Sequence, residues 1–389
     1  MPRDLPGEAP LPLSLYVHLP WCVKKCPYCD FNSYSGGDDA SRRRYLDALC
    51  KDIEAEAARA GGRPLVSIFL GGGTPSLFRA EEIGRLLDVT RSHLACTGDI
   101  EITMESNPGA VEHGDLRGYR DAGVNRLSVG AQSFDSARLA ALGRIHGVDD
   151  IGATVTEAVD AGFDDINIDI MYALPGQDVA GALSDIDAAA SLEPTHLSWY
   201  QLTLEPNTVF HTRPPRDLPD EDLCFSIQEA GEARLAELGF ERYEVSAWAR
   251  GGRRCRHNLN YWSFGDYIAV GAGAHGKLSA SAGIVRYKKP ANPLQYMQQI
   301  EKGGGQDAAQ KLGDSDLLFE FMLNALRLAD GFDEQLFVER TRLPLPVLRE
   351  RLLPLATRGL IAGGEGGHWR PTAKGRQFLN DLQAHFLPD

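Results

Sequence analysis

The chain has 389 residues, of which 43% are hydrophobic and 24% are charged, and its formal net charge is −14. This length is sufficient for one large α/β domain and a smaller module. The negative charge argues against non-specific binding to nucleic acid or to anionic lipid. No apolar run reaches the ~18 residues that a membrane-spanning helix needs. The first fifteen residues, MPRDLPGEAPLPLSL, lack the apolar stretch of a signal peptide. We therefore expect a cytoplasmic protein with no transmembrane segment and no nucleic-acid partner.

Six short apolar or β-branched runs alternate with helical segments in the first half of the chain. The segment Ser41–Ala60 has the spacing of an amphipathic helix, with an apolar face that includes Tyr45 and Leu49. Strands that are each followed by a crossover helix form parallel sheets. The pattern therefore predicts an α/β fold, a parallel partial TIM barrel of the (β/α)6 type, whose strands cover residues 13–19, 65–72, 99–105, 124–130, 164–172 and 196–202.

The pattern changes near residue 311, which indicates a second domain. Helical segments, a Gly-rich hairpin and a last helix follow, as in a winged-helix-like module. We expect a disordered N-terminal segment at 1–12, the barrel at 13–300, a linker at 301–311 and the module at 312–389. Residues 313–389 include nine basic and eleven acidic side chains, so the module has no positive excess for DNA binding. We expect it to dock a partner or to cover the barrel.

Three of the seven cysteines, Cys22, Cys26 and Cys29, lie close together directly after the first predicted strand. An odd number of cysteines in a reducing compartment argues against a disulfide framework and favours metal binding or catalysis. The C-x3-C-x2-C spacing favours a [4Fe–4S] cluster with one open iron position over structural zinc. A zinc ion needs a fourth ligand, for which only His18 and Cys50 are near in the sequence. Zinc and unligated thiols stay as alternatives.

Polar residues follow several of the predicted strands, where a parallel barrel places its functional groups. In DIEITMESNPG, alternation along the strand directs Glu105 to the barrel interior, and the same alternation in DDINIDIMY does so for Asp169. Buried carboxylates need partners or ligands, and Gln132 and Arg144 are candidate companions. The glycines in FLGGGTPS allow a ligand to approach the backbone closely. An internal salt-bridge and hydrogen-bond network without a cofactor is the alternative.

The segment CVKKCPYC, with Tyr28 before its last cysteine, resembles the cluster motif of radical S-adenosylmethionine (SAM) proteins. In that superfamily the uncoordinated iron binds the amino and carboxylate groups of SAM. The motifs YVHLPWC, GGGTPS, ESNPG, SVGAQSF, LGRIH and NIDIMYALPGQ resemble, in this order, the branch that contains oxygen-independent coproporphyrinogen III dehydrogenase and the HemW heme chaperones. The resemblance implies a [4Fe–4S] cluster on the three cysteines. It also implies SAM-binding positions at Tyr16, Tyr28, Gly72, Gly73, Thr74, Glu105, Gln132, Arg144 and Asp169.

By the same resemblance, Glu105 and Arg144 meet the methionine end of SAM. Gln132 and Asp169 meet its ribose hydroxyls.

Two features distinguish the members of this branch. The dehydrogenase pattern has a further cysteine two residues after the third, where this chain has Phe31. The segment CRHNLNYWSFGDY, in a region at about 243–277, contains the HN-x-x-YW motif associated with the HemW chaperones. His257 is a candidate axial ligand for heme iron, and Tyr261 and Trp262 offer flat apolar contact to a porphyrin. Simple packing of the aromatic side chains in a loop is the alternative. Competing ligand candidates are Cys255 and His275.

The resemblance favours a heme chaperone that carries an exchangeable SAM and transfers heme to an acceptor apo-hemoprotein, for which a membrane respiratory enzyme is one candidate. This hypothesis assigns no catalytic residue. The alternative is an enzyme, coproporphyrinogen III dehydrogenase, which decarboxylates propionate side chains oxidatively by radical chemistry. A zinc-stabilised binding module is a third hypothesis, from another class. The resemblance also allows for a homodimer and for peripheral attachment to a membrane through a partner.

Overall fold

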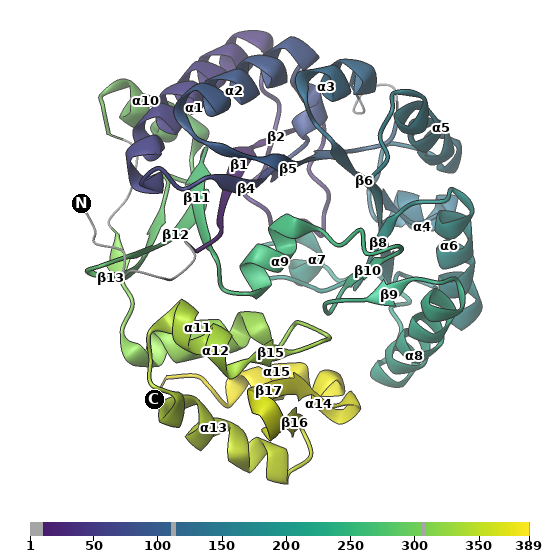
Figure 1. Ribbon diagram of the computed structural model, residues 1–389. Coiled ribbons are helices and arrows are strands. Elements are labelled where there is room, and N and C mark those ends of the chain that lie inside the picture. Colours follow the sequence, from purple (N-terminus) through teal and green to yellow (C-terminus); the bar gives the residue numbers. More distant parts are fainter. Residues whose placement is uncertain (1–10, 110–113, 305–308, 389) are drawn as a thin grey trace.

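The computed structural model describes residues 11–109, 114–304 and 309–388. In this part of the chain the main sheet has 12 strands, and its centre is the series β1-β4-β5-β6-β7-β8. All neighbours in this series are parallel. The predicted parallel α/β fold is therefore confirmed, and the curved sheet is consistent with a partial barrel (Figure 1). The six strands are β1 (Leu13–Leu19), β4 (Leu65–Gly72), β5 (Cys96–Ser106), β6 (Arg126–Gln132), β7 (Ile166–Tyr172) and β8 (His196–Gln201).

Helices between the central parallel strands, and one after the last of them, cover the outer face of the sheet (Figure 1). The first, α1, begins where the Asp38 side chain accepts a hydrogen bond from the Ser41 amide, and Gly61, with a φ of 62°, caps its C-terminal end. It starts two residues before the predicted helix and ends at the predicted residue. The covering helices are α1 (Asp39–Ala60), α2 (Ala80–His93), α3 (Leu116–Ala122), α4 (Ser136–Ala141), α5 (Val148–Asp160), α6 (Val179–Ser191) and α8 (Glu221–Glu237).

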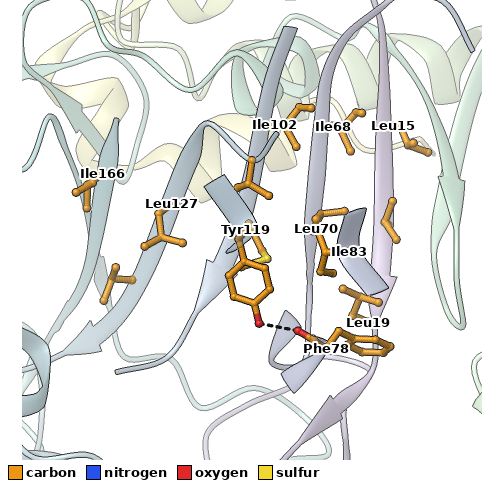
Figure 2. Close-up of a cluster of buried hydrophobic side chains, with 14 of the residues drawn as sticks. Leu15, Leu19, Ile68, Leu70, Phe78, Ile83, Ile102, Tyr119, Leu127 and Ile166 are labelled. Carbon is orange, nitrogen blue, oxygen red and sulfur yellow. Dashed lines mark hydrogen bonds between the residues drawn. The ribbon is translucent and has the colours of Figure 1, made fainter. Parts of the chain in front are cut away.

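The main hydrophobic core lies between the sheet and these helices. Figure 2 shows a row of side chains from neighbouring strands, including Ile68, Ile102 and Leu127, that point to the helical layer. The Tyr119 hydroxyl donates to the carbonyl oxygen of Phe78 at 2.6 Å and so ties α3 to the segment before α2. Because side chains alternate along a strand, this outer face uses every second residue. The remaining residues face inward.

The inner face of the sheet is polar. Buried inward residues near the amino ends of the strands include Ser14, Ser67 and Thr103, and Asn167 and His196 continue this face on β7 and β8. Ser14 Oγ and Ser67 Oγ are 2.7 Å apart, and Asn167 Oδ1 is 2.6 Å from His196 Nδ1. The inside of a closed TIM barrel is usually packed with branched apolar side chains. Here the sheet instead encloses hydrogen-bonded groups, with the candidate site above them.

Additional strands extend both edges of the sheet. At one edge β11 pairs with β1 in parallel, and β12, β13 and β14 follow in antiparallel order; at the other, β10 and β9 follow β8. These are β9 (Glu241–Arg242), β10 (Ala247–Ala249), β11 (Asp266–Val270), β12 (His275–Ala280), β13 (Gly283–Lys288) and β14 (Gln310–Lys311). The remaining elements of this part are β2 (Trp21–Cys22), β3 (Tyr34–Ser35), the 3-10 turn η1 (Pro75–Leu77), α7 (Val209–Thr212), α9 (Arg256–Trp262) and α10 (Pro293–Glu301).

The C-terminal part has its own hydrophobic core, which includes Phe321, Phe337 and Trp369. A small antiparallel sheet of order β15-β17-β16 packs with the helices. In Figure 1 this part lies below α9, and the amide of Ala329 donates to the carbonyl oxygen of Tyr243 at 3.0 Å. The elements are α11 (Asp314–Ala325), β15 (Phe332–Asp333), α12 (Glu334–Thr341), α13 (Leu345–Thr357), β16 (Ile361–Gly363), η2 (Glu365–Gly367), β17 (His368–Pro371), α14 (Ala373–Gln377) and α15 (Leu379–Ala384).

The expected domain bounds stay a prediction. Of the segment 1–12, residues 1–10 lie outside the described residues, as do 305–308 of the expected linker. The end of that linker, Gln310–Lys311, forms β14 and pairs with β13. Among the residues that the structure describes, no helix combines the length and the apolar character needed to cross a membrane.

Candidate functional site

A cavity of about 640 Å³ opens at the carboxyl ends of the parallel strands. Its walls come from the loop after β1 and from the ends of β4 to β8, which is where a parallel barrel presents functional groups. The cavity brings together most of the predicted site residues: Cys22, Cys26, Tyr28, Cys29, Gly72, Gly73, Thr74, Glu105, Gln132, Arg144, Asp169 and Trp262 all line it. Three predicted residues, Tyr16, His257 and Tyr261, are not among its lining residues.

The three cysteines form one wall of this cavity as free thiols. The Cys29 amide donates to the Cys26 carbonyl oxygen at 3.2 Å, which turns the loop so that all three side chains share the wall. In the described part of the chain, no three His, Cys, Asp or Glu side chains are grouped to hold a single metal ion. The three thiols on one wall suit an iron–sulfur cluster, for which thiolates are the usual ligands. Phe31, 58% exposed, lies at the same rim.

The glycines after β4 bring the backbone close to the end of β1. Gly72 has a φ of 114°, and a Cβ atom at this position would lie 2.4 Å from Cε1 of His18. A Cβ atom on Gly73 would lie 2.6 Å from the carbonyl oxygen of Trp21. No side chain fits at either position, so the backbone itself forms the cavity wall. Thr74 is buried beside them, and its Oγ1 accepts a hydrogen bond from Asn107 Nδ2 at 3.1 Å.

Two carboxylates face the cavity, as the strand alternation predicted. Glu105 Oε2 accepts a hydrogen bond from the Gly72 amide at 3.0 Å. Burial, opposed by the Gly72 amide and assisted by the charge of Asp169, raises the pKa of Glu105 to about 7. Asp169 accepts hydrogen bonds from Ser128 Oγ at 3.0 Å and Asn167 Nδ2 at 2.8 Å, and burial raises its pKa. Both acids are therefore held where a cationic or hydroxyl-bearing ligand can bind.

Gln132 and Arg144 complete the same wall of the cavity. Gln132 has a φ of 72°, a strained value for a residue with a side chain, and its Oε1 accepts a hydrogen bond from the Tyr200 hydroxyl at 2.8 Å. The Arg144 guanidinium donates through Nη2 to Asn107 Oδ1 at 2.5 Å, and its Nη1 lies 3.6 Å from Cys26 Sγ. Arg144 thus links the cysteine loop to the ends of β5 and β6. It also places a positive charge beside the Cys26 thiol.

The two tyrosines of the predicted SAM set have different positions. Tyr28 lines the cavity between the cysteines and packs on Phe210, with ring centroids 6.2 Å apart. Burial raises the pKa of Tyr28 above its usual value, so this phenol stays neutral. Tyr16 is not among the lining residues, and its hydroxyl is 3.0 Å from His18 Nδ1. His18 Nε2 is 2.9 Å from the carbonyl oxygen of Asn32 in the cysteine loop. The His18 ring therefore connects the Tyr16 hydroxyl to this loop.

The predicted heme residues lie on two different faces of α9. His257 is 3% exposed, its Nδ1 is 3.0 Å from Ser67 Oγ, and burial lowers its pKa to about 3. Tyr261, one turn along, packs against Tyr267 with ring centroids 4.1 Å apart and the rings tilted by 32°. Asn258 and Trp262, also one turn apart, line the cavity. Because residues four apart share a helix face, the motif presents one pair to the interior of the sheet and the other pair to the cavity.

Glu101 fixes this orientation of α9. Its Oε1 accepts a hydrogen bond from the His257 amide at 3.1 Å, and its Oε2 accepts one from the Arg256 amide at 2.9 Å. The competing ligand candidates also lie away from the cavity walls. Cys255 is buried with its Sγ 3.5 Å from Glu101 Oε1, and His275 is exposed on β12. Direct contact of His257 or Cys255 with a ligand in the cavity would require α9 to move.

Comparisons with known proteins place the chain in a family. Residues 16–187 match the radical SAM superfamily, and residues 312–378 match the HemN C-terminal domain. A protein of Escherichia coli named heme chaperone HemW is 43% identical over 379 residues, covering 97% of this chain and 99% of its own length. The chain belongs to the HemW family. A heme chaperone HemW of Bacillus subtilis is 32% identical over 381 residues, covering 96% of this chain and 99% of its own length.

A solved structure supports the same fold. The Escherichia coli coproporphyrinogen III oxidase (HemN), described as a radical SAM enzyme, superimposes with a TM-score of 0.81 at 26% identity, and the match covers 97% of this chain and 90% of HemN. The predicted resemblance is therefore confirmed. Membership of the radical SAM superfamily implies a [4Fe–4S] cluster and SAM, and the thiols, carboxylates and close backbone of the cavity are suited to both.

Several cavity residues of this HemW-family chain were not predicted. Tyr200 follows His196 and Ser198 along β8, so alternation within HLSWYQL would have identified it as inward-facing. Asn107 lies in the ESNPG turn, directly after Glu105 and Ser106 at the end of β5. Arg327 comes from the C-terminal part and has no such signal, because nothing in its local pattern indicates that it reaches the cavity.

Proposed function

We propose that this HemW-family chain is a heme chaperone that carries a [4Fe–4S] cluster and an exchangeable SAM, binds heme and transfers it to an acceptor protein. The observation that carries the proposal is one continuous cavity that joins the three-cysteine wall to the cavity face of the HN-x-x-YW helix. The 43% identity to the Escherichia coli heme chaperone HemW over nearly the whole chain supports the same function.

In this proposal Cys22, Cys26 and Cys29 hold the cluster. When bound, the cluster supplies an open iron position for the amino and carboxylate groups of SAM and an electron for its sulfonium. The Gly72–Gly73 backbone and Glu105 suit the SAM ammonium group, because a carboxylate in a buried site attracts a cation strongly. Arg144 lies beside Cys26 and suits the SAM carboxylate. Asp169 and Gln132 have acceptor oxygens that suit the ribose hydroxyls.

Heme, the cargo of this chaperone, binds at the α9 motif. Trp262 and Asn258 already face the cavity, so they contact the porphyrin without rearrangement. The role of His257 as axial ligand stays a prediction. It requires α9 to turn or to shift, since the imidazole lies on a different face of the helix, with its Nδ1 3.0 Å from Ser67 Oγ.

An anaerobic preparation tests the cluster and the cargo together. We expect iron and sulfide after reconstitution, SAM binding that depends on the cluster, and a Soret band that shifts and saturates on heme addition. Cys22→Ser should lose iron and sulfide, whereas the matched control Cys224→Ser, on α8 outside the cavity, should keep both. A wild type that binds zinc in place of iron, or that gives no saturable Soret change, would contradict the proposal.

His257→Ala tests the axial ligand. If His257 binds the iron, this variant changes the wavelength and spin state of bound heme, and the control His275→Ala on exposed β12 does not. Identical heme spectra for the wild type and His257→Ala, with circular dichroism showing that the variant is folded, would remove this role.

Coproporphyrinogen III dehydrogenase activity is the second candidate function, since the HemN structure superimposes over nearly the whole chain. Phe31 at the rim, in place of the further cysteine of the dehydrogenase pattern, favours the chaperone. Incubation with coproporphyrinogen III, SAM and a reductant should give no protoporphyrinogen. Sustained turnover in this assay would favour the dehydrogenase function over the chaperone function.

Partners and location stay part of the proposal. We propose an apo-hemoprotein acceptor, with a membrane respiratory enzyme as one candidate, and a cytoplasmic protein that reaches the membrane through that partner. Homodimerisation is a further expectation, which sedimentation of the reconstituted protein with and without heme would test.

A further inference from the structure

The cavity extends beyond the residues assigned to the cluster and to SAM. Its remaining part is lined by Glu244 and Ser246 from the β9–β10 turn, Asn258 and Trp262 from α9, and Arg327 from the segment after α11. We call these five residues the C-terminal lobe of the cavity. Arg327 is the contribution of the C-terminal part, so the lobe forms only where this part packs against the barrel.

The guanidinium of Arg327 is held in a defined orientation. It lies over the Trp262 ring, with Cζ 4.2 Å from the ring centroid, a cation–π contact that fixes its plane. Its Nη2 is 3.4 Å from Glu244 Oε2. The backbone next to it is anchored as well, since Leu328 forms a β-bridge with Glu244. A guanidinium has five N–H donors, and the Glu244 contact uses one of them.

The Arg327 side chain is accessible, whereas its acidic partner is not. The side chain of Arg327 is 29% exposed, and the residue lines the cavity. Glu244 is 3% exposed, and its Oε1 accepts a hydrogen bond from the Ser246 amide at 3.2 Å. A charge pair at 3.4 Å is longer than a good charge-assisted hydrogen bond, which is about 2.7–2.9 Å. A carboxylate that enters from the cavity therefore has both the access and the donors to bind Arg327 better than Glu244 does.

The other residues that line the cavity limit the chemical class of ligand that can bind. Leu202 and Met171 add apolar surface to the same cavity, and Asn258 adds an amide. A cation at one end of an apolar and aromatic space fits a flat apolar ring system that carries a peripheral carboxylate. We propose that Arg327 binds a propionate of the heme that this chaperone carries, so that the C-terminal part supplies the carboxylate-binding cation. This inference rests on the proposed function.

The experiment compares heme with heme dimethyl ester, in which both propionates are esterified, on the full-length reconstituted protein. Arg327→Gln should weaken heme binding about tenfold, the loss expected for a charge-assisted hydrogen bond, and should leave binding of the ester unchanged. Arg254→Gln is the matched control, because Arg254 joins the barrel to the C-terminal part through Asp330 at 2.8 Å without lining the cavity. It should leave the affinity for both ligands unchanged.

A second variant acts in the opposite direction. Glu244→Gln removes the competing carboxylate but keeps an acceptor for the Ser246 amide, so it should tighten heme binding several-fold. A variant that merely failed to fold could not produce this gain. Equal heme affinity of Arg327→Gln and wild type, or an equal loss for heme and for the ester, would overturn the role of Arg327. Absence of any heme binding by the wild type would instead overturn the proposed function.

Discussion

The backbone amide of Gly72 donates a hydrogen bond to Oε2 of Glu105 at 3.0 Å. This contact joins the end of β4 to the end of β5 at the wall of the cavity. It places a half-buried carboxylate against a stretch of backbone from which side chains are sterically excluded. Both residues were predicted from the sequence as SAM-binding positions, and their relationship leads to two predictions.

Glu105 should make folding depend on pH. Burial raises the pKa of Glu105 to about 7 in the folded protein, whereas an unfolded glutamate titrates near 4.3. The folded state therefore holds this proton more tightly, and the associated stability is complete below the unfolded pKa and is lost as the pH rises through about 7. The folding stability lost over this whole pH range because of Glu105 is on the order of 3 kcal/mol. Relative to wild type, Glu105→Gln should gain stability between pH 5 and pH 8 in urea unfolding of the cluster-free protein.

The control for this measurement is Glu81→Gln, at an exposed position on α2. Its unfolding free energy should follow that of the wild type at both pH values. A constant difference between Glu105→Gln and wild type from pH 5 to pH 8 would contradict the buried titration.

Gly72→Ala should be much more destabilising than an ordinary glycine substitution. The new Cβ would lie 2.4 Å from Cε1 of His18, and His18 is held by Tyr16 and Asn32 and has little room to move. We expect a loss of about 3 kcal/mol or more, from backbone strain plus overpacking. Gly62→Ala is the matched control, because Gly62 also has a positive φ of 78° but open space around its Cβ position. Gly62→Ala should lose about 1 kcal/mol of unfolding free energy. Similar losses for both variants would show that the His18 contact is unimportant.

Tyr200 should position Gln132 for SAM. Its hydroxyl donates to Gln132 Oε1 at 2.8 Å, and Gln132 has a strained φ of 72°. Without this hydrogen bond the amide of Gln132 is free to turn, so Tyr200→Phe should weaken SAM binding by about three- to tenfold. Equilibrium binding of SAM to the reconstituted protein measures this effect. Tyr119→Phe loses hydrogen bonds to Ser76 and Phe78 outside the cavity, and it should lower stability while SAM affinity stays the same. Unchanged SAM affinity in Tyr200→Phe would remove the positioning role.

Lys289 should be essential for stability, although it does not line the cavity. Its Nζ lies 2.6 Å from Asp52 Oδ1 and 2.7 Å from Glu56 Oε1, and all three side chains are buried. Lys289→Met leaves the buried Asp52 carboxylate without its cation and leaves Glu56 with Arg59 alone, at 3.7 Å, at a cost of about 3–5 kcal/mol of unfolding free energy. Arg44→Met is the control, since Arg44 pairs with Glu301 at 2.7 Å on the surface, and it should lose less than about 1 kcal/mol. Chemical unfolding of both variants checks the difference, and a small loss for Lys289→Met would contradict it.

The sequence by itself determined where the six central parallel strands lie and which of their residues face inward, but it did not predict the edge strands β9 to β14. Glu105 and Asp169 were identified this way, because the alternation of side chains along a strand is a local property that the sequence states directly. The three cysteines were identified by their spacing within one short loop. For these groups the parallel topology then required a shared location, since the carboxyl ends of parallel strands meet at one end of the sheet.

Only the tertiary structure decided how the HN-x-x-YW helix is oriented. Spacing shows that His257 and Tyr261 share one face of α9 and that Asn258 and Trp262 share another, but it does not show what each face contacts. Glu101, more than 150 residues away in the sequence, decides this by binding the amides at the start of α9. Arg327 reaches the cavity for the same kind of reason. Its position depends on how two separately packed parts of the chain meet, which no local pattern in either part records.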